Sequence, residues 1–319
     1  MRYKCRGMSA VAFVLKRLLG AIPTLALVVA LSFLLTRLAP GGPFDQEQAL
    51  APEIRANLEA AYGLDQPVYL QFGRYVQGLL RGNFGPSFKF RDFSVGELIA
   101  DGLPVSLALG AAAMLVALTL GIPAGICAAL SRGRAADRLV MSLAIAGISI
   151  PLFVAAPLLA LVFGIWLRWL PVAGWHPGRA SDLVLPVVSL ALPVFAFVAR
   201  LVRGSLLEVL RAPWMRAARA RGLSGATVLL RHALPAAMLP VVSFVGPAAA
   251  AVLAGSLVVE TWFSLPGMGR HLVQGALNRD YTLVMGMVIV YAALMIALNL
   301  AADLVLAALD PRIRRGRRQ

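Results

Sequence analysis

Residues 233–259 read ALPAAMLPVVSFVGPAAAAVLAGSLVV, a run of 27 residues that contains no charged side chain. A helix needs about 20 predominantly apolar residues to cross the hydrocarbon core of a bilayer. This run is therefore long enough for one transmembrane helix, and it is rich in proline and small residues. We expect a helix that bends at its prolines and approaches its neighbours closely.

Five further charge-free apolar runs occur along the chain, over 18–36, 103–130, 139–167, 183–199 and 281–302. The run 183–199 is short, and we expect it to continue helically past Arg200, whose charge reaches toward the interface. The run 18–36 is favoured as an uncleaved anchor over a signal peptide, because five more spans follow it. With 60% hydrophobic and 14% charged residues, the composition excludes soluble, disordered and collagen-like proteins. The sequence predicts an all-α polytopic membrane protein with six transmembrane helices.

Lysine and arginine are distributed unevenly between the two sides of the predicted bundle. An even number of spans places both termini on one side, and that side holds 20 of the 30 basic residues. The opposite side holds 10 basic and 11 acidic residues. Because cytoplasmic loops carry the excess of positive charge, both termini are predicted to be cytoplasmic. The net charge of +15 is then explained by topology, and a nucleic-acid partner is not expected.

Two connections between the spans are long enough to hold structure of their own. The external segment 40–101 is expected to contain a short helix over 53–62, ended by Gly63, and an amphipathic helix over Val68–Leu80. The stretch 200–232 is far longer than a cytoplasmic turn requires. The division expected is a cytoplasmic N-terminus (1–17), a transmembrane domain (18–310) and a basic cytoplasmic tail (311–319).

Several kinds of chemistry leave no signature in the chain. The sequence has no phosphate-binding GxxxxGK[ST] loop, no HExxH or GxSxG motif, and no metal-ligand spacing among its three histidines. The spans also lack the mid-membrane charges typical of ion-coupled carriers. Asp303, near the inner end of the last span, is expected to pair with an arginine rather than to relay protons. A transporter of this composition would need a partner that supplies energy.

The cytoplasmic segment 211–235 is a candidate site for such a partner. Met215–Arg221 is rich in alanine and arginine, and it is expected to form a short helix that stops at Gly222. Ser224 is placed to cap a second helix that runs toward the fifth span. Two short helices joined at a glycine make a compact surface that can pass a rigid-body displacement into the spans.

The spacing Ala-Ala-x3-Gly in this segment, followed by Leu234-Pro235, resembles the coupling loop of bacterial ABC importer permeases. Arg216 stands where the general pattern favours glutamate, a departure that suits the peptide-transport branch. Further stretches are similar to that branch: KRLL (16–19), YGLDQP (62–67), LPGMG (265–269), NRDY (278–281) and LDPR (309–312). GPSFKF (85–90) and RGS (203–205) resemble the B-type permease of oligopeptide importers. The resemblance covers nearly the whole chain.

The resemblance implies a type I ABC importer permease fold in the bacterial inner membrane and a non-catalytic subunit. Its implied partners are a second homologous permease, two ABC ATPase subunits and an external solute-binding protein that delivers peptide. The chain would bind no cofactor, since ATP and Mg belong to the ATPase subunits. The residues expected at the ATPase-coupling site are Ala217, Ala218, Gly222, His232 and Pro235.

Alternatives remain open at this point. Gly222 can be an ordinary helix stop, and His232 can cap the fifth span instead of contacting an ATPase. The segment 40–101 can contact the binding protein or pack on the partner permease. The same architecture can import dipeptides, nickel chelates, glutathione or another small solute, and the substrate-path residues are not identified. A self-sufficient carrier or channel and an intramembrane enzyme are remote alternatives. The family resemblance begins near Met8, so residues 1–7 can be an upstream extension.

Overall fold

The computed structural model describes residues 10–38, 63, 65–90, 92–176 and 178–309. The predicted helix over 53–62, residues 1–7 and the tail 311–319 lie outside the described residues. The long helices are α1 (Ala10–Leu38), α4 (Val95–Leu130), α5 (Ala135–Ser149), α7 (Ser181–Arg211), α11 (Leu239–Trp262) and α13 (Tyr281–Leu309). The shorter ones are α3 (Val68–Leu80), α6 (Leu152–Leu159), α8 (Pro213–Ala220), α9 (Gly225–Thr227), α10 (Leu234–Ala237) and α12 (Met268–Leu277).

Five helices are long and apolar enough to cross a membrane: α1, α4, α7, α11 and α13. The run 139–167, expected to form one span, is divided into a pair of helices. After α5 the chain bends by 110° into α6 and its π-helical continuation over Ala160–Trp166. Ile150 at the bend is extended, with φ −83° and ψ 116°, because a residue before proline avoids the helical region and Pro151 follows. Counted as one broken span, the pair brings the total to six, in agreement with the prediction.

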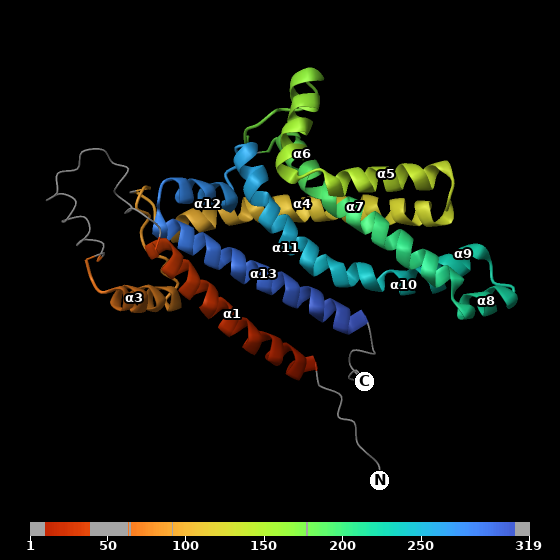
Figure 1. The fold of residues 1–319 in the computed structure, drawn as a ribbon, viewed down its shortest axis with the longest axis horizontal. Coiled ribbons are helices and arrows are strands. Elements are labelled where there is room, and N and C mark those ends of the chain that lie inside the picture. The colour runs from red at the N-terminus through yellow and green to blue at the C-terminus, as the bar shows by residue number, and fades with distance from the viewer. Residues whose placement is uncertain (1–9, 39–62, 64, 91, 177, 310–319) are drawn as a thin grey trace, which may run out of the picture.

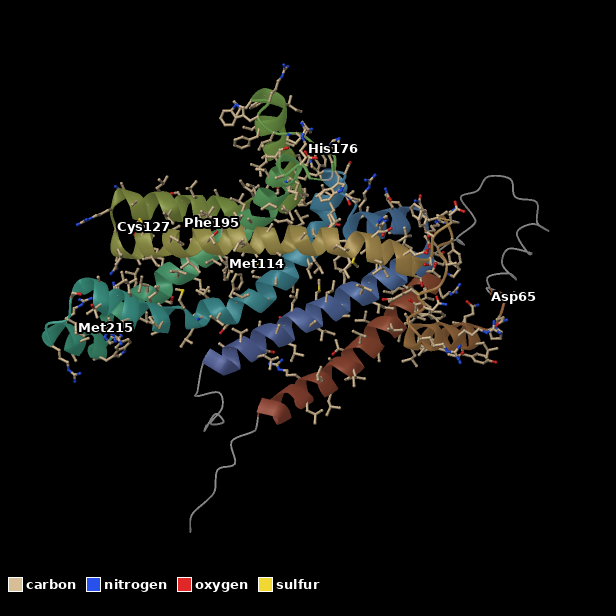
Figure 2. All side chains as sticks on the ribbon, turned by 180° about the vertical axis from the view of Figure 1, so that it is seen from behind. Asp65, Met114, Cys127, His176, Phe195 and Met215 are labelled. Atoms are coloured by element: carbon tan, nitrogen blue, oxygen red, sulfur yellow. The ribbon has the colours of Figure 1, made fainter. Side chains whose placement is uncertain are left out.

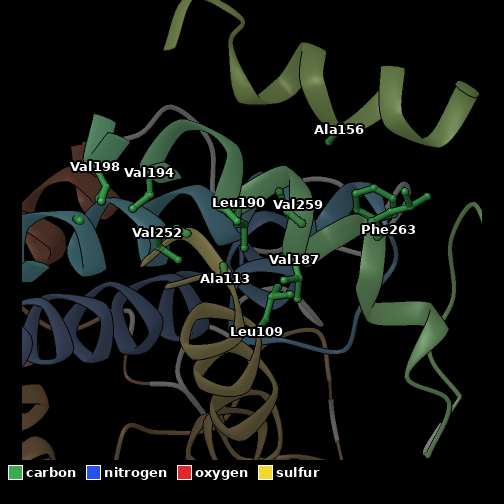
Figure 3. Close-up of a cluster of buried hydrophobic side chains, with 14 of the residues drawn as sticks. Leu109, Ala113, Ala156, Val187, Leu190, Val194, Val198, Val252, Val259 and Phe263 are labelled. Atoms are coloured by element: carbon green, nitrogen blue, oxygen red, sulfur yellow. The ribbon is translucent and has the colours of Figure 1, made fainter. Parts of the chain in front are cut away.

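The core of the bundle lies where α4, α7 and α11 meet (Figure 3). Leu109, Leu190 and Val252 are among the side chains that fill it. The pair α4–α7 forms the most extensive helix contact among the described residues. Small residues allow this approach: a Cβ added to Gly125 would lie 2.6 Å from the carbonyl oxygen of Ala199.

The outermost helix, α1, packs mainly against α13. Its Arg17 forms an ion pair with Asp303 of α13, with 3.1 Å between Nη2 and Oδ2. The expected pairing of Asp303 with an arginine is therefore confirmed. On the other side of α1, Phe33 contacts Phe72 and Tyr75 of α3, with ring centroids 5.2 and 6.4 Å away. The amphipathic helix predicted over Val68–Leu80 is thus confirmed and is held against the first span.

The elements predicted for opposite sides of the membrane gather at opposite ends of the bundle (Figure 1). The short helices α8 and α9 lie at the same end as the turn that joins α4 to α5. The helices α3 and α12 lie at the other end. Figure 2 shows the same separation from behind, with Met215 and Cys127 near one end and Asp65 at the other.

Candidate coupling surface

The candidate surface begins where α7 ends. Ala212 is extended, with φ −61° and ψ 145°, and turns the chain out of the long helix. Pro213 follows in the first turn of α8, where its missing N–H costs nothing. The chain therefore leaves the span and starts a separate short helix without a connecting loop.

The helix α8 is amphipathic and sits on the bundle through one anchor. Met215 is fully buried, whereas Arg216, Ala217 and Arg219 on the other faces are exposed. The helix ends as predicted at Gly222, whose φ is +79° and whose N–H donates to the carbonyl oxygen of Arg219 at 3.0 Å. This left-handed conformation strongly favours glycine. Gly222 therefore fixes the direction in which the chain leaves α8.

The second predicted helix also begins where expected. The hydroxyl of Ser224 accepts a hydrogen bond from the backbone N–H of Thr227 at 3.3 Å, which caps α9. The helical path continues through a π-helical segment over Val228–Ala233 and then through α10. The α8–α9 hairpin is thus joined almost continuously to α11, with a break near Met238.

A small apolar cluster lies between this hairpin and the bundle. Met215 packs there with Ala129 of α4, Leu206 of α7, and Val228 and Ala233 of the π-helical segment, all nearly or fully buried. Because packed interiors are close to incompressible, a force on α8 reaches three other elements through Met215. The hairpin is therefore anchored to the bundle through Met215 and this apolar cluster.

Two polar contacts connect the helices around the apolar cluster that contains Met215. The hydroxyl of Ser205 donates to the carbonyl oxygen of Ala237 at 2.8 Å and ties α7 to α10. Arg203 of α7 binds Asp137 of α5 in a bidentate manner, with Nε–Oδ1 at 2.6 Å and Nη2–Oδ2 at 2.8 Å. Asp137 also accepts from the backbone N–H of Gly133 at 2.8 Å. The turn between α4 and α5 is thereby fixed to α7.

The five residues expected at the coupling site fall into two groups. Ala217 and Gly222 are exposed on the hairpin, and Ala218 is half-buried against the apolar cluster. His232 is half-buried inside the π-helical segment and Pro235 is exposed in α10, so neither belongs to the tip of the hairpin. The structure therefore brings Ala217, Ala218 and Gly222 together and places the other two along the connection to α11.

The sequence alone did not identify the residues that anchor the hairpin and the helices beside it. Met215 was included in the predicted helix with no role, and Asp137 was counted only as a charge. The buried position of Met215 follows from its place opposite the arginines of a short amphipathic helix, so helical periodicity would have identified it. The Asp137–Arg203 pair joins residues 66 positions apart, and no local pattern marks it.

Replacing Asp137 by asparagine is expected to destabilise the end of the bundle at which α8 and α9 lie. The change leaves the guanidinium of Arg203, whose side chain is 27% exposed, without its counterion. Because both partners are partly shielded from water, the cost should be about 2 kcal/mol. The thermal denaturation midpoint of the purified protein in detergent measures it, with Arg138→Gln on the exposed side of α5 as the control. The double variant Asp137→Asn/Arg203→Gln should lose less than the sum of the two single variants.

A second ordered region lies at the opposite end of the bundle, in the loop after α11. Glu260, expected to mark a span end, is fully buried. Its Oε2 accepts from the backbone N–H of Gly269 at 2.7 Å, while the hydroxyl of Ser106 accepts from the N–H of Met268 at 2.9 Å. These contacts hold the LPGMG stretch against α4 and α11. They set the position of α12.

The stretch 85–90 and the start of α13 are also joined at this end. Asp280 is buried, and its carboxylate accepts from the backbone N–H of Leu283 at 3.1 Å, which caps α13. The hydroxyl of Ser87 donates to the same carboxylate and accepts from the N–H of Phe90 at 2.9 Å. Two motifs of the sequence, GPSFKF and NRDY, are therefore partners in one hydrogen-bonded junction.

The chain matches known proteins over nearly its whole length. Residues 121–315 match the family model of the binding-protein-dependent transport system inner membrane component, and residues 10–110 match the model of its N-terminal part. The chain is 48% identical over 302 residues to the oligopeptide transport system permease protein OppB of Escherichia coli strain K12 and 47% identical to that of Haemophilus influenzae. Each alignment covers 95% of this chain and 99% of the relative. The dipeptide transport system permease protein DppB of Bacillus subtilis is 38% identical, over 95% of this chain and 97% of its own.

Among solved structures, the chain resembles the MetNI methionine ABC transporter in inward facing conformations. The TM-score is 0.56 at 20% identity, and the match covers 67% of this chain and 96% of the other. At this identity the likeness concerns the fold.

Proposed function

The chain belongs to the family of binding-protein-dependent transport system inner membrane components, and on that premise we propose that it is the permease subunit of an ATP-driven oligopeptide importer. The observation that carries the proposal is the 48% identity over 95% of the chain to an oligopeptide permease. The chain is a multi-pass protein of the bacterial inner membrane and a non-catalytic transport component. ATP hydrolysis belongs to separate subunits.

We propose that the complete importer holds a second homologous permease, two ABC ATPase subunits that bind ATP and Mg, and an external solute-binding protein. The α8–α9 hairpin is the surface for one ATPase, with Ala217, Ala218 and Gly222 at the contact and His232 and Pro235 along the connection to α11. Support comes from the geometry of the hairpin: an exposed basic tip anchored by Met215 to several helices of the bundle. Closure of the ATPase pair would displace α8 and tilt α7 and α11 together.

The proposal is tested by purifying the chain from its own membrane in mild detergent and identifying the proteins that accompany it. A second permease together with ATPase subunits is the expected result. Proteoliposomes containing that complex and the binding protein should take up labelled oligopeptide only when ATP is available on the ATPase side. Preferential uptake of dipeptides would mean that the chain belongs to a dipeptide importer instead. A chain that purifies alone and transports without an ATPase would contradict the importer.

A further inference from the structure

The helix α7 is buried along most of its length, with one exposed stripe near its inner end. In its most apolar stretch 61% of the residues are buried, the largest share among α1, α4, α7, α11 and α13. Phe197, Arg200, Gly204, Glu208 and Arg211 are nevertheless all exposed. Their spacing of three and four residues places them on one face of the helix. This face is polar and lies in the half of α7 nearer to the coupling hairpin (Figure 1).

Arg200 is the deepest charge on the stripe. It lies 11 residues before the end of α7 at Arg211, which is about 16 Å along a helix. Because hydrocarbon solvates a charge poorly, a charged side chain at such a position reaches toward the interface or faces a water-filled space or a protein partner. Among the residues that the structure describes, no carboxylate forms an ion pair with Arg200. The guanidinium therefore has unused capacity for an anion.

Aromatic rings flank this guanidinium on its outer side. The carbon Cζ of Arg200 lies 5.8 Å from the centroid of the Phe197 ring. That ring is stacked on Phe244 of α11, with centroids 4.2 Å apart and planes at 19°. The stacked pair joins the two helices that lead to the coupling hairpin, so movement between α7 and α11 would separate the rings. The two stacked rings and the cation therefore form one contiguous aromatic and cationic patch across α7 and α11.

The stripe continues into open space toward the inner end. A Cβ added to Gly204 would have no neighbouring atom within 4 Å. Beside it lies a pocket of about 370 Å³, lined by Arg132, Arg203, Gly204, Leu207, Glu208 and Arg211. Three arginines and one glutamate make this lining polar and mainly basic. The stripe therefore leads from the aromatic pair past Arg200 to a mainly basic pocket.

We propose that Arg200 is a contact for the C-terminal carboxylate of the peptide as it passes the Phe197–Phe244 pair. The inference rests on the proposed function, because an oligopeptide is the cargo that carries this anion. A guanidinium matches a carboxylate in charge and in its paired donors. The open face at Gly204 gives the peptide backbone room beside the cation, and the basic pocket beyond it receives the carboxylate next.

The test compares two forms of one peptide, a free acid and its C-terminal amide, in proteoliposomes that contain the full importer. Wild type should take up the acid faster than Arg200→Gln does, whereas uptake of the amide should differ little between them. The ratio of acid to amide uptake should fall about tenfold in Arg200→Gln, which corresponds to the loss of one charged hydrogen-bonded contact. Arg200→Lys should keep most of the ratio. Arg134→Gln, which removes an exposed arginine from the α4–α5 turn, is the control.

The same binding protein delivers both peptides to every variant, so its own preference cancels when the ratios of variants are compared. An equal decrease for acid and amide in Arg200→Gln would mean that Arg200 only anchors the helix at the membrane surface or packs on Phe197, and would overturn the inference. An unchanged ratio would overturn it as well. Failure of the proposed function has a different result: the wild-type complex would take up neither peptide with ATP.

Discussion

Replacing Gly222 by proline is expected to separate ATP hydrolysis from peptide uptake while the protein remains inserted in the membrane. Proline fixes φ near −65°, and Gly222 stands at +79°. The chain then leaves α8 in another direction, and the α8–α9 hairpin no longer presents the same surface. Since coupling between sites is typically worth 1–3 kcal/mol, the peptide transported per ATP should fall about tenfold or more. Uptake and phosphate release, measured together in proteoliposomes, give this ratio.

Gly20→Ala is the control for this prediction. Gly20 lies in α1, outside the hairpin, and a Cβ added there meets no atom within 4 Å. Its transport per ATP should equal that of the wild type. A bulky residue at Ala218 should act like Gly222→Pro, because Ala218 is half-buried against the cluster around Met215. Normal uptake in both Gly222→Pro and Ala218→Trp would remove the hairpin from the coupling path.

Adding one methyl group at Gly267 is expected to unfold the outer loop. A Cβ at this position would overlap the carboxylate of Glu260 and lie 2.8 Å from the hydroxyl of Ser106. The same two side chains accept the backbone hydrogen bonds from Gly269 and Met268, so the methyl group breaks buried contacts as well as crowding them. Overpacking together with the loss of buried hydrogen bonds should cost about 3 kcal/mol or more. The thermal midpoint and the detergent-extracted yield of Gly267→Ala measure this loss.

Gly73→Ala adds the same methyl group to an exposed face of α3, where nothing lies within 4 Å. Alanine favours a helix over glycine, so this control should be as stable as the wild type or slightly more stable. If crowding against Glu260 is the cause, Gly267→Ala should cost less in a Glu260→Ala background than in the wild type. An equal cost in both backgrounds would mean that the carboxylate is not what the methyl group meets.

Local patterns predicted the elements of this fold well, because each pattern reports the element in which it occurs. The charge-free runs marked the spans, and the period of apolar residues marked Val68–Leu80. Ser224 and Gly222 marked a helix start and a helix stop, which depend only on nearby backbone groups. The prolines indicated bends in the spans, but not which of them would give the 110° bend at Pro151. Many prolines in the spans are accommodated within a continuous helix, and only packing decides which one breaks it.

Contacts between distant elements were predicted only in part. The pairing of Asp303 with an arginine followed from the cost of a charge near the membrane, although the sequence did not identify Arg17. Glu260 was placed at a span end because an apolar run stopped there, but its burial depends on Ser106, more than 150 residues earlier. The junction of Ser87 with Asp280 has the same character. These residues lie in recognisable motifs of the sequence, but only the fold shows which of them contact each other.

The packing of α1 on α13 has a consequence for how the protein is made. The main neighbour of α1 is α13, and more than 240 residues are synthesised between them. Until α13 arrives, α1 must reside in lipid, held by its own hydrophobicity and by the flanking basic residues. The surface of α1 is suited to contact with lipid during this time, because large leucines such as Leu19, Leu27 and Leu35 remain exposed along it even in the complete bundle. The ion pair of Arg17 with Asp303 then forms among the last contacts of biogenesis and marks a chain that has been inserted completely.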